Sequence, residues 1–263
     1  MTNLLEARSL SKRFGGVQAL GEVSLSIPTG AIYGLIGPNG AGKTTLFNVL
    51  TGLYQADSGA LHFAQQNILN DKPHRIVQAG IARTFQNIRL FGHMTALENV
   101  MVARHSQTKS GVLGAIFRPP AVQKEEAEIK RRALALLNYV GLAKRAQHQA
   151  SALSYGEQRR LEIARALATE PKLLALDEPA AGMNPAERND LRTLMQTINA
   201  DGVTLLLIEH DVKLVMGLCS KVAVLDFGVK IAEGSPTEVQ ANPAVIAAYL
   251  GAASDTLGKH KHA

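Results

Sequence analysis

The sequence predicts an α/β fold that contains a parallel sheet. A glycine-rich segment at residues 37–45 lies between an apolar, β-prone run at 31–36 and a run at 46–50 that can continue as a helix. Beyond residue 158, predicted helices alternate with short apolar runs that are typical of buried strands. Such alternation of helix and buried strand is typical of a parallel sheet covered by helices.

The glycine-rich segment, called the phosphate loop below, matches the pattern G-x-x-x-x-G-K-[ST]. Its glycines let backbone N–H groups point at a phosphate chain, and the following helix adds the positive end of its dipole. Lys43 supplies a charge for the β- and γ-phosphates, and the Thr44 hydroxyl can bind Mg²⁺. The sequence therefore predicts that ATP or GTP binds here. The residues expected to hold the nucleotide are Gly37, Pro38, Asn39, Gly40, Ala41, Gly42, Lys43, Thr44 and Thr45.

The other elements follow from hydrophobic periodicity and from turn residues. Residues 4–36 and 59–68 contain short strands separated by turns. Helices are expected at 95–104, 123–140, 159–169, 186–199 and 244–250, and buried strands at 173–176 and 204–208. The run 106–122, which contains two consecutive prolines, is interpreted as a loop or a short helical insertion.

The C-terminal part of the chain has clear turn and capping signals. A hairpin is expected at 222–231 around Phe227 and Gly228. Ser235 begins a capping box with proline at the first helical position, and Asn242 repeats the arrangement for the last helix. Residues 252–263 are expected to form a disordered tail.

Composition restricts the class of protein. At 263 residues with 46% hydrophobic content, the chain can form one large domain with a substantial core. The net charge of +6 fits nucleic acid or an anionic membrane surface, but the charges are spread along the chain and tryptophan is absent. No apolar run reaches the roughly 18–20 residues of a membrane span, and no secretory signal is visible. Cys219 is the only cysteine, which fits a reducing cytosol and predicts a place in the core.

Three sets of polar residues point to phosphate chemistry. Asp177 and Glu178 end an apolar strand, where one carboxylate can hold Mg²⁺ and the next can polarise an attacking water. A solvated turn is the alternative interpretation of these acids. His210 ends the next strand and could hydrogen-bond a γ-phosphate. Gln86 follows a short apolar run and could bind Mg²⁺ or position water.

A second candidate anion site lies at 153–157, called the signature segment below, which opens a long helix. Ser154 and the backbone N–H groups from Gly156 onward can bind an anion at the helix N-terminus. One phosphate chain does not readily explain two such sites within a monomer. We therefore expect two chains to face each other, each completing the nucleotide site of the other.

In this order, the phosphate loop, Gln86, the signature segment, the Asp177–Glu178 pair and His210 resemble the ATPase subunits of ABC transporters. The resemblance covers about residues 4–251 and implies a P-loop NTPase core with an antiparallel β subdomain and a helical subdomain at about 87–158, all within one domain at 1–251. It implies catalytic roles for Glu178, His210 and Gln86, and Mg²⁺ binding by Thr44, Gln86 and Asp177. It also implies nucleotide contacts from Phe14, which stacks on adenine, and from Val17, Ser154, Gly156 and Glu157.

Departures from the usual motifs restrict the resemblance to one group of ABC-transporter ATPases. Tyr155 replaces the first glycine of the signature, and Ala181-Gly-Met-Asn184 replaces a usual Ser-Ala-Leu-Asp. With residues 83–91 and the ending at 233–251, these variants are similar to the larger ATPase of branched-chain amino acid importers. Importers of urea or short amides and a lipopolysaccharide exporter are the close alternatives.

The resemblance also implies partners and a location. The expected partners are integral membrane permease subunits, a second ATPase subunit that is a different chain, and indirectly a substrate-binding protein. The expected location is the cytoplasmic face of the inner membrane, as a peripheral subunit. No nucleic acid partner is expected, since ABC ATPases that act on nucleic acid usually carry a coiled-coil insertion or two ATPase domains. A regulatory nucleotide binder is expected to lack Lys43, Glu178 or His210, and all three are present.

The residues after Gln86 form a further candidate contact. Residues 86–94, called the glutamine segment below, are rich in large apolar side chains. These side chains either belong to the core or line a groove for a short helix of a membrane subunit. In the second case Arg89 could cap the C-terminus of that helix. The groove residues would be Ile88, Leu90, Phe91 and Met94.

Overall fold

The computed structural model describes residues 2–104 and 120–258, which form two sheets with helices around them. A four-stranded antiparallel sheet has the order β2-β1-β4-β5, and a six-stranded sheet has the order β10-β9-β3-β8-β7-β6. In the second sheet only the β9–β10 pairing is antiparallel. The strands are β1 (Asn3–Phe14), β2 (Val17–Pro28), β3 (Ile32–Ile36), β4 (Ser58–Phe63), β5 (Gln66–Asn67), β6 (Ile81–Arg83), β7 (Leu173–Asp177), β8 (Thr204–Ile208), β9 (Lys221–Asp226) and β10 (Val229–Gly234).

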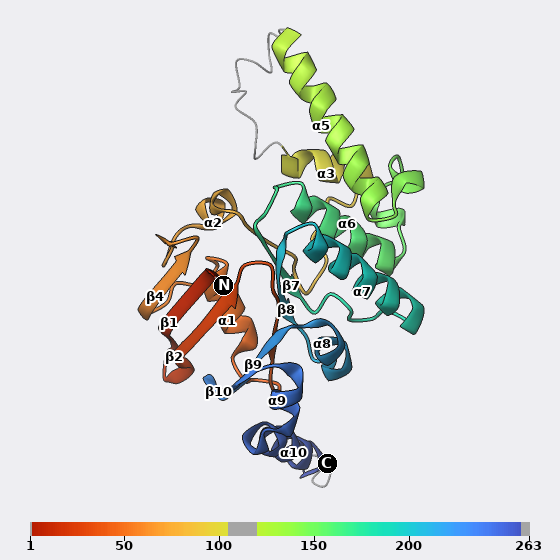
Figure 1. Cartoon of the computed structure of the whole chain (residues 1–263). Coiled ribbons are helices and arrows are strands. Elements are labelled where there is room, and N and C mark those ends of the chain that lie inside the picture. The colour runs from red at the N-terminus through yellow and green to blue at the C-terminus, as the bar shows by residue number, and fades with distance from the viewer. Residues whose placement is uncertain (1, 105–119, 259–263) are drawn as a thin grey trace.

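The helices lie on both faces of the six-stranded sheet and beyond one end of it (Figure 1). Helix α1 lies between the two sheets, and α6, α7 and α8 cover the opposite face, while α3 and α5 project away from the sheets. The helices are α1 (Lys43–Leu50), α2 (Pro73–Ala79), α3 (Ala96–Arg104), α5 (Pro120–Tyr139), α6 (Tyr155–Leu167), α7 (Pro185–Ala200), α8 (Val212–Leu218), α9 (Pro236–Ala241) and α10 (Pro243–Gly258), with short 3₁₀ turns η2 (Ala143–Arg145) and η3 (Ala150–Ala152).

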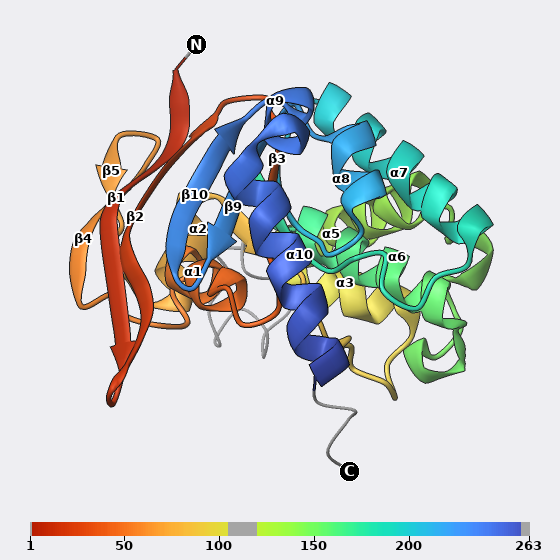
Figure 2. The ribbon, with the colours of Figure 1, turned by 90° about the horizontal axis from the view of Figure 1, so that it is seen from below.

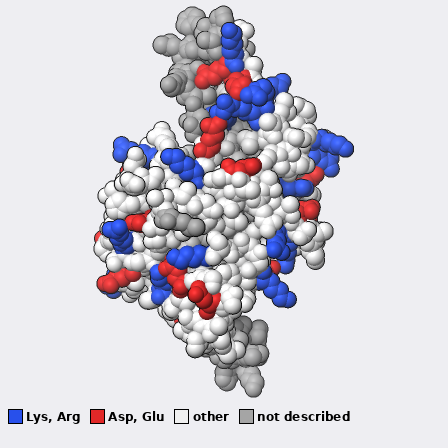
Figure 3. Space-filling view, viewed as in Figure 1, with Lys and Arg blue, Asp and Glu red and all other residues white. Residues whose placement is uncertain are grey.

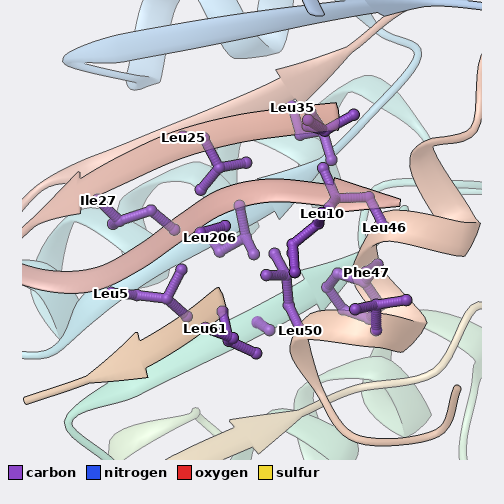
Figure 4. Packing of buried hydrophobic residues seen from close by; sticks show 14 of the residues in the cluster. Leu5, Leu10, Leu25, Ile27, Leu35, Leu46, Phe47, Leu50, Leu61 and Leu206 are labelled. Carbon is purple, nitrogen blue, oxygen red and sulfur yellow. The ribbon is translucent and has the colours of Figure 1, made fainter. Parts of the chain in front are cut away.

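The two faces of the six-stranded sheet contribute to different cores. Along β8, Leu206 and Ile208 face α1 and the antiparallel sheet and belong to the first core. Leu205 and Leu207 face α6 and α7 and belong to the second core. Successive side chains of a strand point to opposite faces, which explains this alternation. Phe47 of α1 is buried in the first core, together with the leucines labelled in Figure 4. Because α1 begins at the end of the phosphate loop, this packing fixes the direction in which the loop leaves the sheet.

Cys219 lies in the second core and is 6% exposed, as the sequence predicts. Its Sγ approaches β3 so closely that a Cβ on Gly34 would lie 3.0 Å from it. Burial raises the pKa of the thiol to about 12, so the thiolate does not form at neutral pH.

A third core joins α3, α5 and the following turns, and it corresponds to the predicted helical subdomain. This core continues into α6 through Leu161, Ala164 and Ala168, past the expected boundary at residue 158. Helix α6 therefore packs on both the helical part and the six-stranded sheet, since Ile163 belongs to the second core. Movement of the helical part relative to the sheet must act on this helix.

Most predicted elements are present, including the hairpin around Phe227 and the capping box at Ser235. The N-terminal strands are longer than expected, because β1 and β2 each run for 12 residues. Register shifts between them and left-handed backbone at Ser9 and Glu22 let these strands continue through positions that resemble turns.

The expectation of a disordered tail from residue 252 is wrong for 252–258. Helix α10 continues to Gly258, because an alanine-rich sequence favours helix and the single Gly251 does not end it. Residues 259–263 lie outside the described residues, as do 105–119 of the predicted insertion. Pro120, at the end of that run, is the first residue of α5.

Candidate functional site

The phosphate loop joins β3 to α1 and passes close to two other backbones. A Cβ on Gly37 would lie 2.1 Å from the carbonyl oxygen of Leu225, and a Cβ on Gly42 would lie 2.7 Å from that of Ala19. The φ angles of these glycines are +152° and +96°. Both positions therefore exclude any side chain, for reasons of space and of backbone conformation.

Lys43 lies at the start of α1 and is only 8% exposed. Its Nζ donates hydrogen bonds to the carbonyl oxygens of Gly37 at 2.7 Å and Pro38 at 2.8 Å, so the side chain folds back over the loop. Burial lowers the pKa of Lys43, while the nearby carboxylates of Glu178 and Asp177 raise it. The ammonium group is thus held by the backbone of the phosphate loop, and the negative charges of the two acids act on it.

The carboxyl ends of the parallel strands bring the predicted catalytic residues together. Glu178 follows β7, and its Oε2 accepts a hydrogen bond from Gln86 Nε2 at 3.0 Å. The same oxygen lies 3.7 Å from His210 Nδ1, which follows β8. Three side chains predicted from separate motifs therefore meet around one carboxylate.

The backbone at Glu178 has an uncommon conformation. Its φ angle is +46°, in the left-handed region, and its N–H donates to the carbonyl of Ile208 at 2.9 Å. A non-glycine residue in this region is held there by its surroundings, and such positions are frequent at functional sites. The bond across to β8 sets the direction of the carboxylate.

Asp177, the last residue of β7, is 4% exposed and lies beside Arg83, a residue that the sequence analysis did not select. Arg83 Nη2 is 3.9 Å from Asp177 Oδ2, and the guanidinium lies over the rings of Phe47 and Phe85. Burial raises the pKa of Asp177 and lowers that of Arg83 to about 10, each opposed by the charge of the other. Arg83 does not belong to any of the motifs that predicted site residues. Its role depends on the pairing of β6 with β7.

The oxygen atoms at this edge fit a small divalent cation. Thr44 offers a hydroxyl, Gln86 an amide carbonyl and Asp177 a carboxylate, which are the hard ligands that Mg²⁺ prefers. Among the described residues, no group of three or more acidic, histidine or cysteine side chains is arranged to hold a metal by itself. A cation here would therefore complete its shell with phosphate oxygens and water, as Mg²⁺ does with nucleotides.

Glu209 is a second residue that the sequence analysis missed. It is 1% exposed and accepts hydrogen bonds from the N–H of Ala180 at 3.0 Å and of His210 at 3.2 Å. The carboxylate thus ties the loop after β7 to the loop after β8. Glu209 follows an apolar strand, and an acid at the end of an apolar strand is the pattern that predicted Asp177 as a site residue.

The signature segment lies at the N-terminus of α6. Ser154 and Glu157 form a capping box, and Glu157 also accepts a hydrogen bond from Arg145 at 2.9 Å. Among the described residues, no hydrogen bond or ion pair joins residues 154–157 to the phosphate loop. Within the described chain, the polar groups of Ser154 and Glu157 bond to the end of α6 and to Arg145.

The predicted adenine platform lies on the surface. Phe14 is 44% exposed at the end of β1, paired across the hairpin with Val17, which is 67% exposed. The ring of Phe14 meets that of Tyr54 edge to face, with centroids 5.3 Å apart. Tyr54 was not predicted, because nothing in its sequence surroundings relates it to Phe14.

The glutamine segment divides between core and surface. Leu90 packs against the helical core, while Phe91 and Met94 are 49% and 38% exposed. The backbone at Phe91 is fixed by Asn99, whose Oδ1 accepts its N–H at 2.9 Å. The guanidinium of Arg165 lies 5.8 Å from the Phe91 ring centroid. Of the four predicted groove residues, Phe91 and Met94 are the ones that a partner could reach most fully.

The C-terminal helix α10 lies on the side of the molecule seen in Figure 2, and its Tyr249 comes close to the backbone of Gly37 in the phosphate loop. Tyr249 of α10 packs against the second core, and its hydroxyl is buried. Burial raises the pKa of this phenol, whereas the backbone N–H of Gly37 lowers it. On the other side of the loop, Gly228 of the β9–β10 turn donates its N–H to the carbonyl of Ala41 at 3.0 Å.

A family model described as ABC transporter matches residues 20–181, a span that includes the phosphate loop, Gln86, the signature segment and Glu178. The chain belongs to the ABC transporter family. A second family model, described as branched-chain amino acid ATP-binding cassette transporter, matches residues 229–255 of this ABC ATPase. The resemblance inferred from the order of motifs is thereby confirmed.

Relatives and solved structures agree with this assignment. The ABC ATPase is 46% identical over 251 residues to the high-affinity branched-chain amino acid transport ATP-binding protein LivG of Salmonella typhimurium, covering 95% of this chain and 98% of LivG. It is 45% identical, with the same coverage, to BraF of Pseudomonas aeruginosa, whose name describes the same function. The ADP conformation of MJ1267, an ATP-binding cassette of an ABC transporter, matches with a TM-score of 0.83 and 34% identity, covering 95% of this chain and all of MJ1267.

These findings establish ATP binding and hydrolysis as the activity of the ABC ATPase and confirm the predicted fold class. None of the described helices has both the length and the apolar character needed to cross a bilayer. On the face shown in Figure 3, Lys and Arg side chains are scattered among Asp and Glu side chains and do not merge into one basic patch. The positive net charge of this ABC ATPase is thus not concentrated on that face.

The burial of Glu209 predicts a pH-dependent stability. Burial raises its pKa above the ordinary value of 4.5, so the folded protein binds the proton more tightly than the unfolded chain. Stability should therefore fall as the pH rises through the raised pKa. In Glu209→Gln this component is absent, so the free energy of unfolding should improve relative to wild type as the pH rises from about 4.5 toward neutrality.

Urea denaturation across this pH range measures the difference. Asp190→Asn, which removes one exposed carboxylate, is the control for the loss of one negative charge. A constant or declining difference for Glu209→Gln would show that the carboxylate does not titrate as its burial requires.

Proposed function

We propose that this ABC ATPase is the ATP-hydrolysing subunit that energises an importer for branched-chain amino acids. The observation that carries the proposal is the match of residues 229–255 to the branched-chain amino acid transporter model, combined with 45–46% identity to LivG and BraF over nearly the whole chain. The site supplies the energy and does not select the cargo, so the substrate class rests on these relatives. An importer of urea or short amides, a lipopolysaccharide exporter and a nucleic-acid-acting ABC ATPase remain the alternatives for the test below.

In the proposed mechanism the phosphate loop and Lys43 hold the β- and γ-phosphates of ATP. Glu178 accepts a hydrogen bond from the attacking water and orients it toward the γ-phosphate, while Gln86 holds the carboxylate in place. His210 donates a hydrogen bond to the γ-phosphate as charge develops. The arrangement of Gln86 and His210 around Glu178 Oε2 supports this assignment.

A Mg²⁺ ion bound with the nucleotide would neutralise charge on the β- and γ-phosphates. The residues that would hold it are Thr44, Gln86 and Asp177. Arg83 Nη2 lies 3.9 Å from Asp177 Oδ2, so its positive charge opposes the buried negative charge of that carboxylate. On the surface, Phe14 is proposed to stack on adenine, with Val17 beside it.

A second ATPase subunit is proposed to complete each site through its signature segment. The lack of any hydrogen bond or ion pair between the signature segment and the phosphate loop among the described residues supports this arrangement. A similar solved structure, that of the ATP-binding cassette MJ0796 bound to ADP and Pi, is dimeric. Ser154, Gly156 and Glu157 would then face the nucleotide of the partner chain. The partner is proposed to be a different ATPase chain, as the resemblance to the larger of two ATPases implies.

The membrane partners are proposed to be integral permease subunits. A substrate-binding protein, which would deliver the substrate to the permease, is an indirect partner. The chain would then be a peripheral subunit on the cytoplasmic face of the inner membrane. The exposed apolar side chains of the glutamine segment offer a contact for a permease helix. This segment begins at Gln86 itself, so movement at the nucleotide can reach it.

Uptake of labelled substrate tests the proposed function directly. Deletion of the chain from its own organism should abolish high-affinity uptake of labelled leucine, isoleucine and valine and leave uptake of labelled urea unchanged. Reintroducing the wild-type chain should restore uptake, because the permease and the second ATPase are still present. Loss of urea uptake with intact leucine uptake would instead assign the chain to an amide importer.

The role of Glu178 predicts the behaviour of Glu178→Gln. This substitution keeps the size of the side chain and removes its negative charge, so ATP binding should persist while hydrolysis falls by about 10²-fold or more. Stopped-assay ATPase rates and an ATP-induced rise in melting temperature measure the two properties separately. Hydrolysis at the wild-type rate would remove Glu178 from the proposed mechanism.

The proposed permease contact predicts the behaviour of Phe91→Ala. Burying this ring against a partner helix would stabilise the complex by roughly 1.5–3 kcal/mol. The variant should fold and bind ATP but copurify poorly with the permease subunits and fail to restore uptake. Phe227→Ala is the matched control, because Phe227 is 85% exposed in the β9–β10 turn. A fall in the melting temperature of isolated Phe91→Ala, with normal copurification, would identify Phe91 as a packing residue only.

A further inference from the structure

Arg159 of α6 is a buried charge that the mechanism above does not use. It is 2% exposed, and its guanidinium donates hydrogen bonds to the carbonyl oxygen of Phe85, at 2.6 Å, and to that of Gln86. Both bonds go to the backbone directly at Gln86. Since a guanidinium is planar and its donors are fixed relative to one another, two such bonds restrict the orientation of this peptide.

The carboxylate of Glu162 makes a further contact between α6 and the backbone of Phe85. Glu162, one turn further along α6, lies 3.2 Å from Arg159 Nη1 and accepts the N–H of Phe85 at 3.2 Å. Phe85 is therefore bonded through both its N–H and its C=O to side chains of a single helix. A buried charge pair with hydrogen bonds to fixed backbone groups is costly to disrupt, and it favours one geometry.

Tyr155 links this pair to the signature segment. Its hydroxyl accepts hydrogen bonds from Arg159 at 2.9 Å from Nη2 and 3.2 Å from Nε. The ring also lies against Gly182 in the loop after Glu178, where an added Cβ would be 3.3 Å from the ring. Tyrosine at 155 and glycine at 182, both departures from the usual motifs, are therefore physically connected, since the alanine usual at 182 would crowd this ring.

We propose that Tyr155 and Arg159 form a positioning pair that holds Gln86 in register with Glu178 and connects it to the signature segment. The inference rests on the proposed role of Gln86. Neither member touches the reacting atoms. Arg159 fixes the backbone from which the Gln86 side chain extends to Glu178, and Tyr155 fixes Arg159. A shift at the signature segment, where a partner chain is proposed to bind, would thereby reach the glutamine of the same chain.

A double-mutant cycle on kcat separates positioning from general destabilisation. Tyr155→Phe removes one hydroxyl and keeps the ring, so the protein should stay folded while kcat falls by about 3–10-fold with little change in the KM for ATP. Arg159→Lys keeps the charge opposite Glu162 but loses the planar donors, and should reduce kcat further. In a Gln86→Ala background, neither substitution should lower kcat again, because the side chain that they position is gone.

Tyr139→Phe is the matched control. Its hydroxyl donates to Asp201 at 2.7 Å, away from the phosphate loop, and the variant should retain the wild-type kcat. Equal losses from Tyr155→Phe with and without Gln86 would overturn the positioning pair and leave the proposed mechanism intact. Wild-type kcat in Gln86→Ala would overturn the role of Gln86 and this inference together. Melting temperatures of all variants identify any that lose activity through unfolding.

Discussion

The close approach of the phosphate loop to neighbouring backbone is the constraint on which the rest of the site depends. At Gly37 the loop lies against the carbonyl of Leu225 in β9, and at Gly42 it lies against that of Ala19 in β2. One of these strands belongs to the six-stranded sheet and the other to the antiparallel sheet. The loop therefore lies where the two sheets meet, and its shape is fixed by both. A side chain at either glycine would clash with the neighbouring strand and would push that strand away from the phosphate loop.

Buried charges hold the loops around this centre. Arg83, Arg159, Glu162 and Glu209 are all largely removed from solvent, and each contacts a loop that carries a predicted catalytic residue. Replacing such groups by apolar side chains often leaves stability unchanged or improves it, so stability alone does not explain their presence. Their shared property is that they bond to backbone or carboxylate groups in one defined geometry. We interpret them as the groups that keep Gln86, Glu178 and His210 within reach of one another.

The sequence was sufficient for the parts of the site that short-range patterns encode. Glu178 and His210 follow apolar strands, and parallel strands place their carboxyl ends at one edge, so their meeting was predictable. Arg83 and Arg159 acquire their roles through contacts with segments distant in sequence, which no local pattern reports. The same reason explains Tyr54, which lies between α1 and β4, whereas its partner Phe14 ends β1, far away in sequence. The length of α10 was missed because one glycine was given more weight than the helix propensity of the alanines around it.

The state of Cys219 has a practical consequence for spectroscopy. The chain has a single cysteine, and its thiol is buried and resistant to ionisation, so maleimide and spin-label reagents should leave it unmodified in the folded protein. The natural sequence can thus serve as a labelling background without removal of a core residue. A cysteine introduced at exposed His93, within the glutamine segment, would carry a fluorophore or nitroxide whose environment changes when a membrane subunit docks or the helical part rotates.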